Sequence, residues 1–430
     1  MASLGLALAA LFALLFWGVP IGFAMGIVGV AGFATIVGWG PAVAMVGQVA
    51  IDNVMNYNFS VLPLFIVMGS LFAHSKMADE LFAAAHAFLG HLRGGLAMAT
   101  ILACGAFSAV SGSSLACAAA MTKVSVPLMQ RRGYDAGFAG ATVAAGSTLD
   151  ILIPPSITMV VYSLLTGVNL GKLMIAGFLP GFLIIVAYLA AIAIVAAIWP
   201  HLGPPGGRTP WRQRFIALKE VWAMVLLFTV ALGGIYFGIF TPTEAAGIGA
   251  FGAFALAVLR RRLSFKAFGE MVVETATTTS MIFFIVIGAL IFANYITVSG
   301  AAGALLAWIG GFHLSSLGLI VMLLAIYIVL GCVLDASAMA VLTVPIFFPM
   351  VTAAGIDPIW FGIFVVIVVG IGMIHPPIGM LLFVVRSLVP GVGAKEIFYG
   401  ITPFLVADAV CIALLIAFPS IVLVLPEFMK

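Results

Sequence analysis

Long apolar runs separated by short polar segments make up almost the whole chain. A helix that crosses a bilayer needs about 20 mostly apolar residues, and fewer where protein rather than lipid surrounds it. Runs of this kind predict spanning helices at residues 2–18, 21–38, 58–73, 136–167, 174–198, 220–239, 243–259, 271–294, 358–385 and 400–425. The pattern therefore predicts an all-α integral membrane protein.

Two further apolar stretches carry polar residues at their centres. In 95–130 the interruption is SGSS (111–114), and in 316–352 it is LDAS (334–337). Non-helical backbone at membrane depth is tolerated only where protein or a cavity surrounds it. We therefore predict that each stretch is a re-entrant hairpin, which descends into the membrane and returns to the side from which it entered.

The basic residues test this topology, because Lys and Arg in short loops concentrate on the cytoplasmic side. If the first hairpin opens to the cytoplasm and the second opens outward, nearly all of them lie inside: Lys76, Arg93, Lys123, Arg131, Arg132, Arg208, Arg212, Arg214, Lys219, Arg260, Arg261, Arg262, Lys266, Arg386 and Lys395. Only Lys172 and Lys430 are then outside. Both termini are predicted to be periplasmic.

The two halves of the chain share a pattern. Matching residues recur at an offset of 222: Pro127 with Pro349, Gly133 with Gly355, Asp135 with Asp357, Gly140 with Gly362, and Pro154-Pro155 with Pro376-Pro377. Each half holds five predicted spans and one hairpin. Because five is odd, the second half enters the membrane with opposite polarity, so the halves form an inverted repeat as in many secondary transporters.

Composition excludes a soluble fold. Charged residues are 7% of the 430 residues and apolar residues 64%, whereas about 25% of an ordinary soluble domain is charged. The net charge of +3 gives no reason to expect nucleic acid as a partner. Cysteines occur singly in apolar runs, so neither a transition-metal site nor an organic cofactor is expected. The first basic residue is Lys76, so the N-terminal run lacks the basic start of a signal peptide and is expected to remain a membrane helix.

Each polar interruption precedes a span broken by a proline pair. Because proline removes its own donor and clashes with the carbonyl four residues back, such a pair leaves carbonyls unpaired, each at a cost of roughly 2 to 7 kcal/mol. A desolvated cation such as sodium would satisfy them, and the N-termini of half-helices would face an anionic substrate. The same small residues and prolines also fit close helix packing and kinks. Their repetition in both halves favours two related ion sites.

Four ionisable residues deserve separate interpretation. A carboxylate near the bilayer centre costs about 2.5 to 3.5 kcal/mol, which makes Asp335 a functional candidate, a structural ion pair or a protonated acid. Asp150 and His375 lie near the proline pairs and are candidates for contact with substrate, ion or proton, although His375 also fits a satisfied core histidine. Glu244, beside a Thr-Pro-Thr run, fits a partner of a helix N-terminus.

Two sequence patterns in the chain also occur in enzymes. Gly247-x-Gly249-x-x-Gly252 matches the dinucleotide fingerprint, but it lies in an apolar helix with no preceding strand, and glycines 18, 22 and 26 similarly predict a packing face. The chain has no P-loop sequence for ATP hydrolysis. The SGSS run also suggests the nucleophile of an intramembrane hydrolase, a distant alternative because no histidine is placed as a base.

The motif-bearing segments resemble a known family. GAFSAVSGSSLACAAA, VPLMQRRGYDAGFAGATVAAGSTLDILIPPSI, LGCVLDASAMAVLTVPIFFPMVTAAGIDPIWFGI and GIGMIHPPIG are similar to the large (M) membrane subunit of tripartite ATP-independent periplasmic (TRAP) transporters. The resemblance implies an elevator-type transporter in a bacterial or archaeal inner membrane. It implies sodium-coupled import of an organic acid, such as a C4-dicarboxylate or sialic acid, delivered by a periplasmic substrate-binding protein. It also implies a small four-helix Q subunit as partner.

The resemblance also divides the chain and assigns roles. It implies scaffold helices with a first arm (76–93) in 1–94, a transport half in 95–199, a cytoplasmic linker in 200–219, scaffold helices with a second arm (298–312) in 220–314, and a second transport half in 315–430. Sodium is expected at Ser111, Gly112, Ser113, Ser114, Gly146, Thr148, Leu334, Asp335, Ser337, Gly370 and Gly372. Substrate is expected at Ser113, Asp150, Pro154, Pro155, Asp335, His375 and Pro376. The family usually has a small residue at 150 and threonine at 375.

Charge movement sets a minimum for the coupling. Importing a dianion against 100 mV costs about 4.6 kcal/mol, and each entering sodium ion returns about 2.3 kcal/mol. We therefore expect at least two sodium ions per cycle. The alternative within transport is a stand-alone sodium- or proton-coupled carboxylate carrier without a binding protein.

Overall fold

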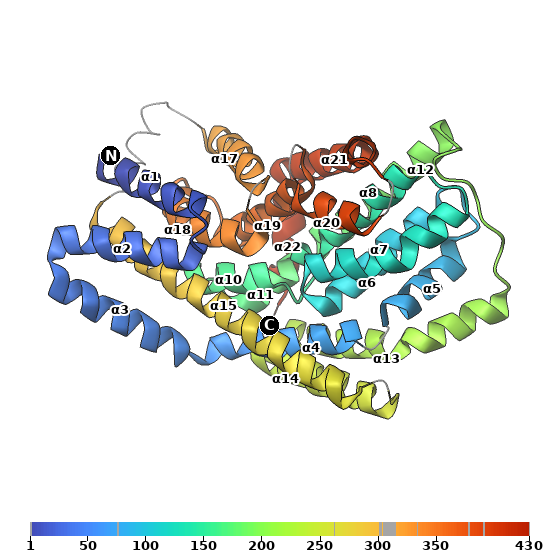
Figure 1. Cartoon of the computed structure of the whole chain (residues 1–430), viewed down its shortest axis with the longest axis horizontal. Helices are drawn as coiled ribbons and strands as arrows, with labels where there is room; N and C mark the ends of the chain where they lie inside the picture. The colour runs from blue at the N-terminus through green and yellow to red at the C-terminus, as the bar shows by residue number, and fades with distance from the viewer. Residues whose placement is uncertain are drawn as a thin grey trace.

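The computed structural model describes residues 2–74, 77–261, 263–300, 303, 315–332, 334–376, 379–389 and 392–429. Every regular element in these ranges is a helix (Figure 1). The first repeat contains α1 (Ala2–Phe16), α2 (Ile21–Val37), α3 (Trp39–Val54), the 3-10 helix η1 (Tyr57–Ser60), α4 (Val61–His74), α5 (Met77–Leu89), α6 (Gly95–Ser111), α7 (Ser114–Arg131), α8 (Ala136–Ser147), α9 (Leu149–Leu152), α10 (Ile157–Thr166), α11 (Leu170–Ala176) and α12 (Phe178–Ile198).

The second repeat contains α13 (Trp211–Tyr236), α14 (Pro242–Leu259), α15 (Phe265–Val298), α17 (Ser316–Gly331), α18 (Ala336–Ala353), α19 (Pro358–Ile374), α20 (Met380–Leu388), α21 (Ala394–Ala417) and α22 (Ser420–Glu427). Within the described ranges, seven helical segments are long and apolar enough to cross a membrane, or eight if the bent pair of Trp39–Val54 and Tyr57–Ala73 forms one span. The prediction of an all-α integral membrane protein is confirmed.

Several predicted boundaries were wrong. No helix was expected between residues 38 and 58, yet α3 fills most of this segment and is bent by 56° from the helix that follows. The predicted linker 200–219 ends early, since α13 begins at Trp211. The last predicted span, 400–425, is broken, because α21 runs from Ala394 to Ala417 and α22 follows it. Most of the predicted second arm lies outside the described residues.

Matched residues of the two halves adopt the same local structure. Gly133 and Gly355 both have positive φ, 81° and 76°, a conformation that glycine adopts without strain. Two residues later, Asp135 accepts a hydrogen bond from the backbone N–H of Phe138, and Asp357 accepts one from that of Trp360. Each aspartate therefore caps the helix that it precedes. The turn before each broken span is thus built in the same way twice.

The hairpins pack onto both halves of the protein. Helix α6 lies against α8, and its counterpart α17 lies against α19. The return limbs cross over, since α7 packs against α20 of the second half and α18 packs against α10 of the first half. In Figure 1, α6, α7, α8 and α20 lie in the right-hand half, whereas α18 lies left of centre, toward α1 and α2. The crossed packing brings both hairpin tips to the broken spans.

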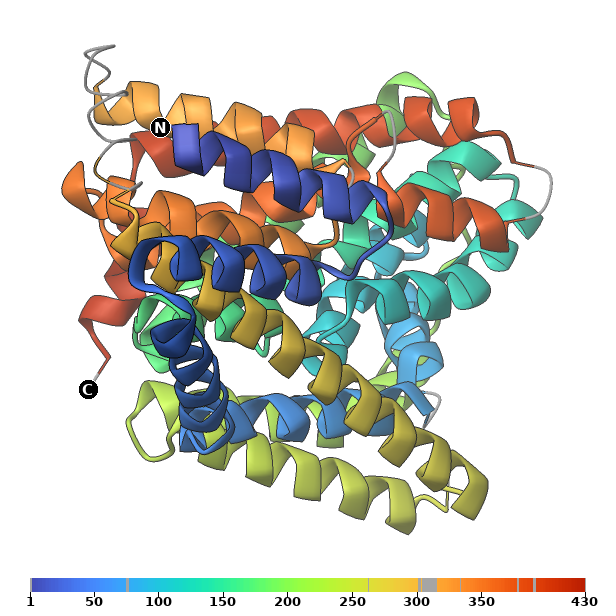
Figure 2. The same ribbon diagram turned by 60° about the vertical axis from the view of Figure 1, so that its left-hand side comes forward.

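Helices α2 and α15 form a close pair across the other side of the molecule. A Cβ atom on Gly22 would lie 2.8 Å from the α-carbon of Ile285, and one on Gly29 would lie 2.8 Å from the backbone nitrogen of Phe292. Only glycine allows this approach, which confirms the packing face expected at Gly22. Gly18 instead lies at the turn after α1, with open space around it. Figure 2 shows α15 running diagonally beneath α2, with α14 beyond it.

Glycines 247, 249 and 252 lie within α14, a single apolar helix, so they form no dinucleotide-binding turn. At the start of this helix Thr241 and Glu244 form a capping box: the Glu244 carboxylate accepts a hydrogen bond from the backbone N–H of Thr241 at 2.8 Å. The interpretation of Glu244 as a helix N-terminal partner is confirmed.

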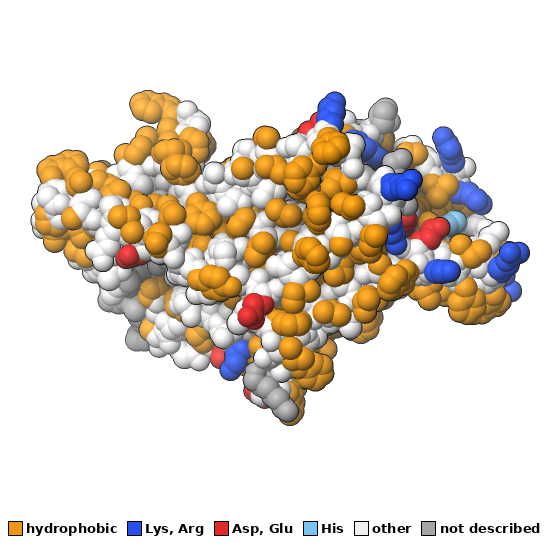
Figure 3. All heavy atoms as spheres, turned by 90° about the horizontal axis from the view of Figure 1, so that it is seen from below, with side chains coloured by type: hydrophobic (Ala, Val, Ile, Leu, Met, Phe, Trp, Pro, Cys, Tyr) orange, Lys and Arg blue, Asp and Glu red, His pale blue; other side chains and the backbone are white. Residues whose placement is uncertain are grey.

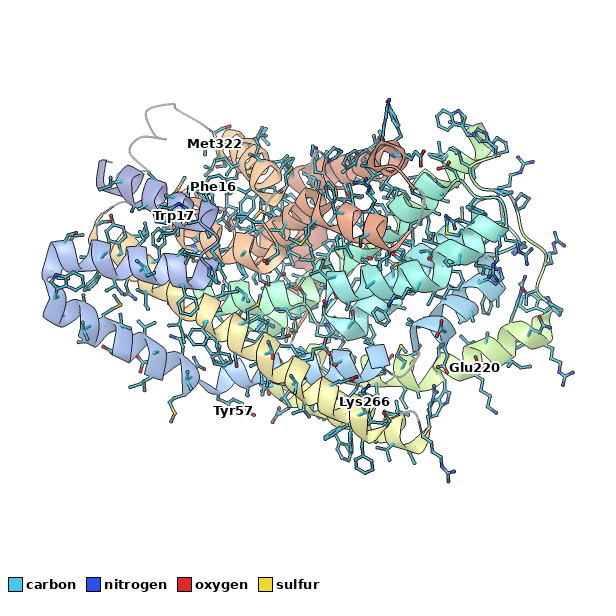
Figure 4. The ribbon with its side chains drawn as sticks, in the orientation of Figure 1. Phe16, Trp17, Tyr57, Glu220, Lys266 and Met322 are labelled. Carbon is cyan, nitrogen blue, oxygen red and sulfur yellow. The ribbon has the colours of Figure 1, made fainter. Side chains whose placement is uncertain are left out.

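The surface is that of a protein surrounded by lipid. Apolar side chains are spread over the whole face in Figure 3. Most of the Lys and Arg side chains on that face lie toward its right-hand end, where the link between α12 and α13 lies in Figure 1. At the end of α1, labelled in Figure 4, Phe16 and Trp17 are 88% and 86% exposed. Such exposure of large apolar residues fits a hydrocarbon surround.

Candidate functional site

The first hairpin consists of α6 and α7, which are joined by only two residues, Gly112 and Ser113. Helix α6 ends at Ser111, Gly112 follows with φ of 60°, and Ser113 caps α7 by accepting a hydrogen bond from the backbone N–H of Ala116 at 3.3 Å. The small side chains allow this sharp reversal, and the N-terminus of α7 remains directed at the tip. The predicted re-entrant break at SGSS is therefore present.

Asp150 of α9 meets this tip. Its Oδ2 atom accepts a hydrogen bond from the Ser114 hydroxyl at 3.1 Å. Asp150, Ser114 and Ser111 are all buried, with 4%, 7% and 7% of their surface exposed. Within the described part of the chain, Asp150 Oδ1 and Ser111 Oγ are buried without a hydrogen-bond partner. The Ser111 side chain and the Ser114 backbone N–H also lie close to the Asp150 carboxylate, so the tip gathers buried oxygens at one point that can hold a small cation or a proton.

The broken span beside the tip satisfies part of its own backbone. The Ser156 hydroxyl donates to the carbonyl oxygen of Ile151 at 2.5 Å and accepts from the N–H of Met159 at 3.4 Å. At least this carbonyl, which the proline argument left open, is therefore paired by a serine and needs no ion. Pro154 and Pro155 are buried, and a Cβ atom on Gly112 would lie 3.6 Å from the Pro155 carbonyl oxygen. The broken span and the tip are thus in contact.

The second tip has the same plan with a different side chain. Asp335 caps α18, accepting a hydrogen bond from the backbone N–H of Ala338 at 2.9 Å. It matches Ser113 at the offset of 222, so both hairpins use this position as an N-cap. Leu334, Asp335 and Ser337 are half-buried, unlike the buried oxygens of the first tip. A cap bond and the helix dipole stabilise the Asp335 carboxylate without an ion.

His375 and Pro376 form the second break. His375 has backbone angles of −81° and 131°, nearly those of its match Ile153 at −83° and 120°. Its Nδ1 atom lies 2.6 Å from the Pro376 carbonyl oxygen, and the Cys332 thiol lies 3.9 Å from the carbonyl oxygens of both residues. The carbonyl oxygens of His375 and Pro376 at this break therefore have side chains of the second half within reach. Pro377 lies outside the described residues.

Three predicted sodium ligands are glycines in close helix contacts. A Cβ on Gly146 would lie 2.8 Å from the sulfur of Cys104, and one on Gly372 would lie 2.6 Å from the α-carbon of Gly331. These two positions serve close packing, the alternative left open for small residues. A Cβ on Gly370 would lie 3.5 Å from that of Thr148, its match at the offset of 222. The two broken spans therefore meet at equivalent positions.

The chemistry available at the first tip is that of oxygen ligands. Hydroxyl, carboxylate and carbonyl oxygens suit hard cations. No group of three or more His, Cys, Asp or Glu side chains that would hold a metal occurs within the described ranges. The tip is therefore suited to an alkali cation or a proton.

Two residues near this region were missed from the sequence. Asp408 of α21 is 1% exposed, and its Oδ1 atom accepts a hydrogen bond from the Tyr188 hydroxyl of α12 at 2.8 Å. Asp408 could have been singled out from the sequence, since an aspartate inside the apolar run 400–425 is as unusual as Asp335. Tyr188 had no comparable signal, because tyrosine is common in membrane helices.

Re-entrant hairpins, paired broken spans and an internal repeat define a multi-pass membrane transporter of the inverted-repeat class. The model of the family "Tripartite ATP-independent periplasmic transporter, DctM component" matches residues 8–421. The chain belongs to this family, the large permease components of TRAP transporters. Membership in a family of transporter permeases sets aside the hydrolase alternative.

Two relatives whose names state a substrate align with nearly the whole chain. The C4-dicarboxylate TRAP transporter large permease protein DctM of Pseudomonas aeruginosa is 35% identical, over 93% of this chain and 94% of that protein. The sialic acid TRAP transporter large permease protein SiaM of Vibrio cholerae is 30% identical, over 96% of each chain. The crystal structure of the Alcanivorax borkumensis YdaH transporter shares the fold, with a TM-score of 0.59, 15% identity, and coverage of 85% of this chain and 88% of that one.

Proposed function

We propose that this chain is the membrane permease of a sodium-coupled TRAP importer for an organic acid, with C4-dicarboxylates and sialic acid as the first substrates to test. The single observation that carries sodium coupling is the cluster of buried oxygens that Ser111, Ser114 and Asp150 bring together at the first tip. The names of the relatives DctM and SiaM support the class of substrate.

A sodium ion at the first tip would contact oxygens from two elements. Ser111 and Ser114 come from the hairpin, and Asp150 comes from the broken span beside it. A carboxylate that gains a cation no longer bears an uncompensated charge in a low-dielectric site. Sodium binding would therefore hold the hairpin tip and α9 together.

The second site would be assembled around Asp335. Its carboxylate is half-buried and therefore reachable by an ion or by substrate. The N-termini of α7 and α18 begin at the two tips, and their backbone N–H groups favour an anionic carboxylate nearby. Ser113 and His375 are the polar side chains that we expect to contact the substrate from either half.

We further propose that the hairpins and broken spans move as one unit against α2, α4, α13, α14 and α15, as an elevator. An apolar cavity of about 240 Å³ lies between α5 and α13 on one side and α6 and α12 on the other, lined by Leu81, Ala106, Phe182 and Phe228 among others. An interface without directional polar contacts resists sliding least. The first arm, α5, contacts the scaffold through a 2.8 Å ion pair between Glu80 and Arg260, the residue that follows α14.

In this assembly the permease works with a small four-helix Q subunit and a periplasmic substrate-binding protein, in the inner membrane of a bacterium or archaeon with both termini periplasmic. The family name, tripartite and periplasmic, supports the partners. At least two sodium ions per cycle are needed to offset the charge of a dianion.

The test is uptake into proteoliposomes that contain the chain with its Q subunit and receive the substrate-bound binding protein. Uptake is expected to require an inward sodium gradient and to fail when potassium replaces sodium. Ser111→Ala should raise the half-saturating sodium concentration about tenfold, which corresponds to about 1.4 kcal/mol.

The matched control is Ser125→Ala. Ser125 is also buried, but its hydroxyl donates to the Met121 carbonyl within α7, away from the tip. Its sodium dependence should be unchanged. Uptake that proceeds equally without sodium would overturn the proposal.

A further inference from the structure

Asp408 lies in the middle of a membrane helix, and no described Lys, Arg or His side chain pairs with it. Helix α21 runs from Ala394 to Ala417, and Asp408 within it is 1% exposed. Its only hydrogen bond among the described residues comes from Tyr188, and its Oδ2 atom is buried without a partner. An ionised carboxylate there would carry a full charge in a low-dielectric setting with a single donor to stabilise it.

The direction of the Tyr188 hydrogen bond is set by its neighbours. The Thr148 hydroxyl lies 3.4 Å from the Tyr188 hydroxyl, but it donates its hydrogen to the Ala145 carbonyl at 2.7 Å. Thr148 can then only accept from Tyr188, and the Tyr188 hydrogen is directed at the closer acceptor, Asp408 Oδ1 at 2.8 Å. The Tyr188 ring is held edge-on against Phe404 of α21, with ring centres 5.3 Å apart, so the donor is fixed in place. Asp408 Oδ2 is the atom left for a proton.

In the part of the chain that the structure describes, no other charged group compensates Asp408. Of the helices packed on α21, α8 and α19 carry no titratable side chain, α20 carries Arg386 and α22 carries Glu427, both exposed. Around α12 the titratable side chains are Cys104 of α6, Asp150 of α9 and Lys172 of α11, of which Lys172 is exposed. On α21 itself the buried neighbour is Cys411. None of these supplies a positive charge in the interior.

We infer that Asp408 and Tyr188 form a proton-binding site in the moving part of the transporter, and that the proton must be bound for this part to cross the membrane. A proton from water forms an O–H bond with Asp408 Oδ2, which makes the carboxyl group neutral. Loss of that proton to water restores a charge that would have to move through the apolar interface. The requirement for movement rests on the proposed elevator function, whereas the protonated carboxyl itself does not.

The first test does not depend on transport. Infrared difference spectra of the purified protein should show the carbonyl stretching band of a protonated carboxyl group, which Asp408→Asn removes. Sodium should leave this band unchanged. Asp150→Asn is the matched control, because it removes the other buried carboxyl group, at the candidate sodium site. Absence of a band that depends on Asp408 would overturn the inference.

The second test is uptake across a pH series. Wild-type uptake should fall as the pH rises and Asp408 loses its proton, whereas Asp408→Asn, a neutral substitute, should remain active with a flat profile. Tyr188→Phe removes a donor that favours the charged form, so its fall in uptake should move to higher pH. An inactive but folded Asp408→Asn protein, or one with the wild-type pH profile, would overturn the requirement for a proton. If uptake proves independent of sodium, the infrared result still decides the proton site.

Discussion

The two hairpin tips share a backbone plan but place their acidic residue on different elements. In the first half the hairpin cap is Ser113 and the broken span carries Asp150; in the second half the cap is Asp335 and the position that matches Asp150 is Gly372. The first acid is buried with one oxygen unpaired, whereas the second is half-buried and bonded to its own helix. An acid that caps its own helix has fixed donors for its charge, whereas a buried acid that caps no helix is stabilised further by a cation or a proton.

The largest expected effect comes from neutralising each acid in turn. Asp150→Asn should abolish sodium-dependent uptake at ordinary sodium concentrations, because it removes the charge that balances the ion at the first tip. The measurement is uptake against sodium concentration. If Asp150→Asn shows the sodium dependence of the wild type, Asp150 is not a sodium ligand. The first tip would then lack the ion site proposed for it, unlike the second tip.

At the second tip, Asp335→Ala should also abolish uptake, but this substitution removes the helix cap as well, worth about 1 kcal/mol of stability. Asp335→Asn separates the two roles, because asparagine caps a helix equally well but carries no charge. We expect a normal melting temperature and at least about a tenfold loss of uptake. Full uptake by Asp335→Asn would reduce Asp335 to a cap.

A smaller effect is expected where the scaffold touches the first tip. A Cβ on Gly69 of α4 would overlap the backbone carbonyl of Ser111, which a side-chain movement cannot relieve. Gly69→Ala should therefore slow uptake several-fold while sodium affinity changes less. Gly247→Ala, on α14 with open space at its Cβ, is the control and should behave as wild type. Equal rates for the two variants would show that α4 does not restrain the tip.

The smallest effect concerns the arm behind the first hairpin. Glu80→Gln breaks the ion pair with Arg260, whose side chains are 11% and 24% exposed respectively. Partly exposed pairs contribute on the order of 1 kcal/mol or less, so a fall of about one degree in melting temperature is expected for a chain of this length. Glu270→Gln, from the exposed pair with Lys266 at 3.9 Å, should leave the melting temperature unchanged. A larger fall in melting temperature for Glu270→Gln than for Glu80→Gln would contradict the expectation that the less exposed ion pair contributes more.

The sequence predicted correctly those parts of the fold that depend on interactions between residues close together in the chain. The breaks at SGSS and LDAS, the matched turns at Gly133 and Gly355 and the capping box at Glu244 all depend on residues within a few positions of one another. Helix α3 was missed because its polar Gln48, Asp52 and Asn53 lower the apolar content on which a span is recognised. The candidate sodium ligands remain predictions, with Gly146 and Gly372 explained by packing.

Hydrophobic length, proline and glycine placement and helix capping are readable from sequence because each acts over one or two helical turns. The tertiary structure alone decided which buried polar atoms meet: Ser114 with Asp150, 36 residues apart, and Tyr188 with Asp408, 220 residues apart. Contacts over such separations depend on how helices cross, and apolar surfaces specify that crossing only through packed shape. For this reason the sequence predicted a transporter, whereas only the tertiary structure brought together the buried oxygens at which we propose that a cation and a proton bind.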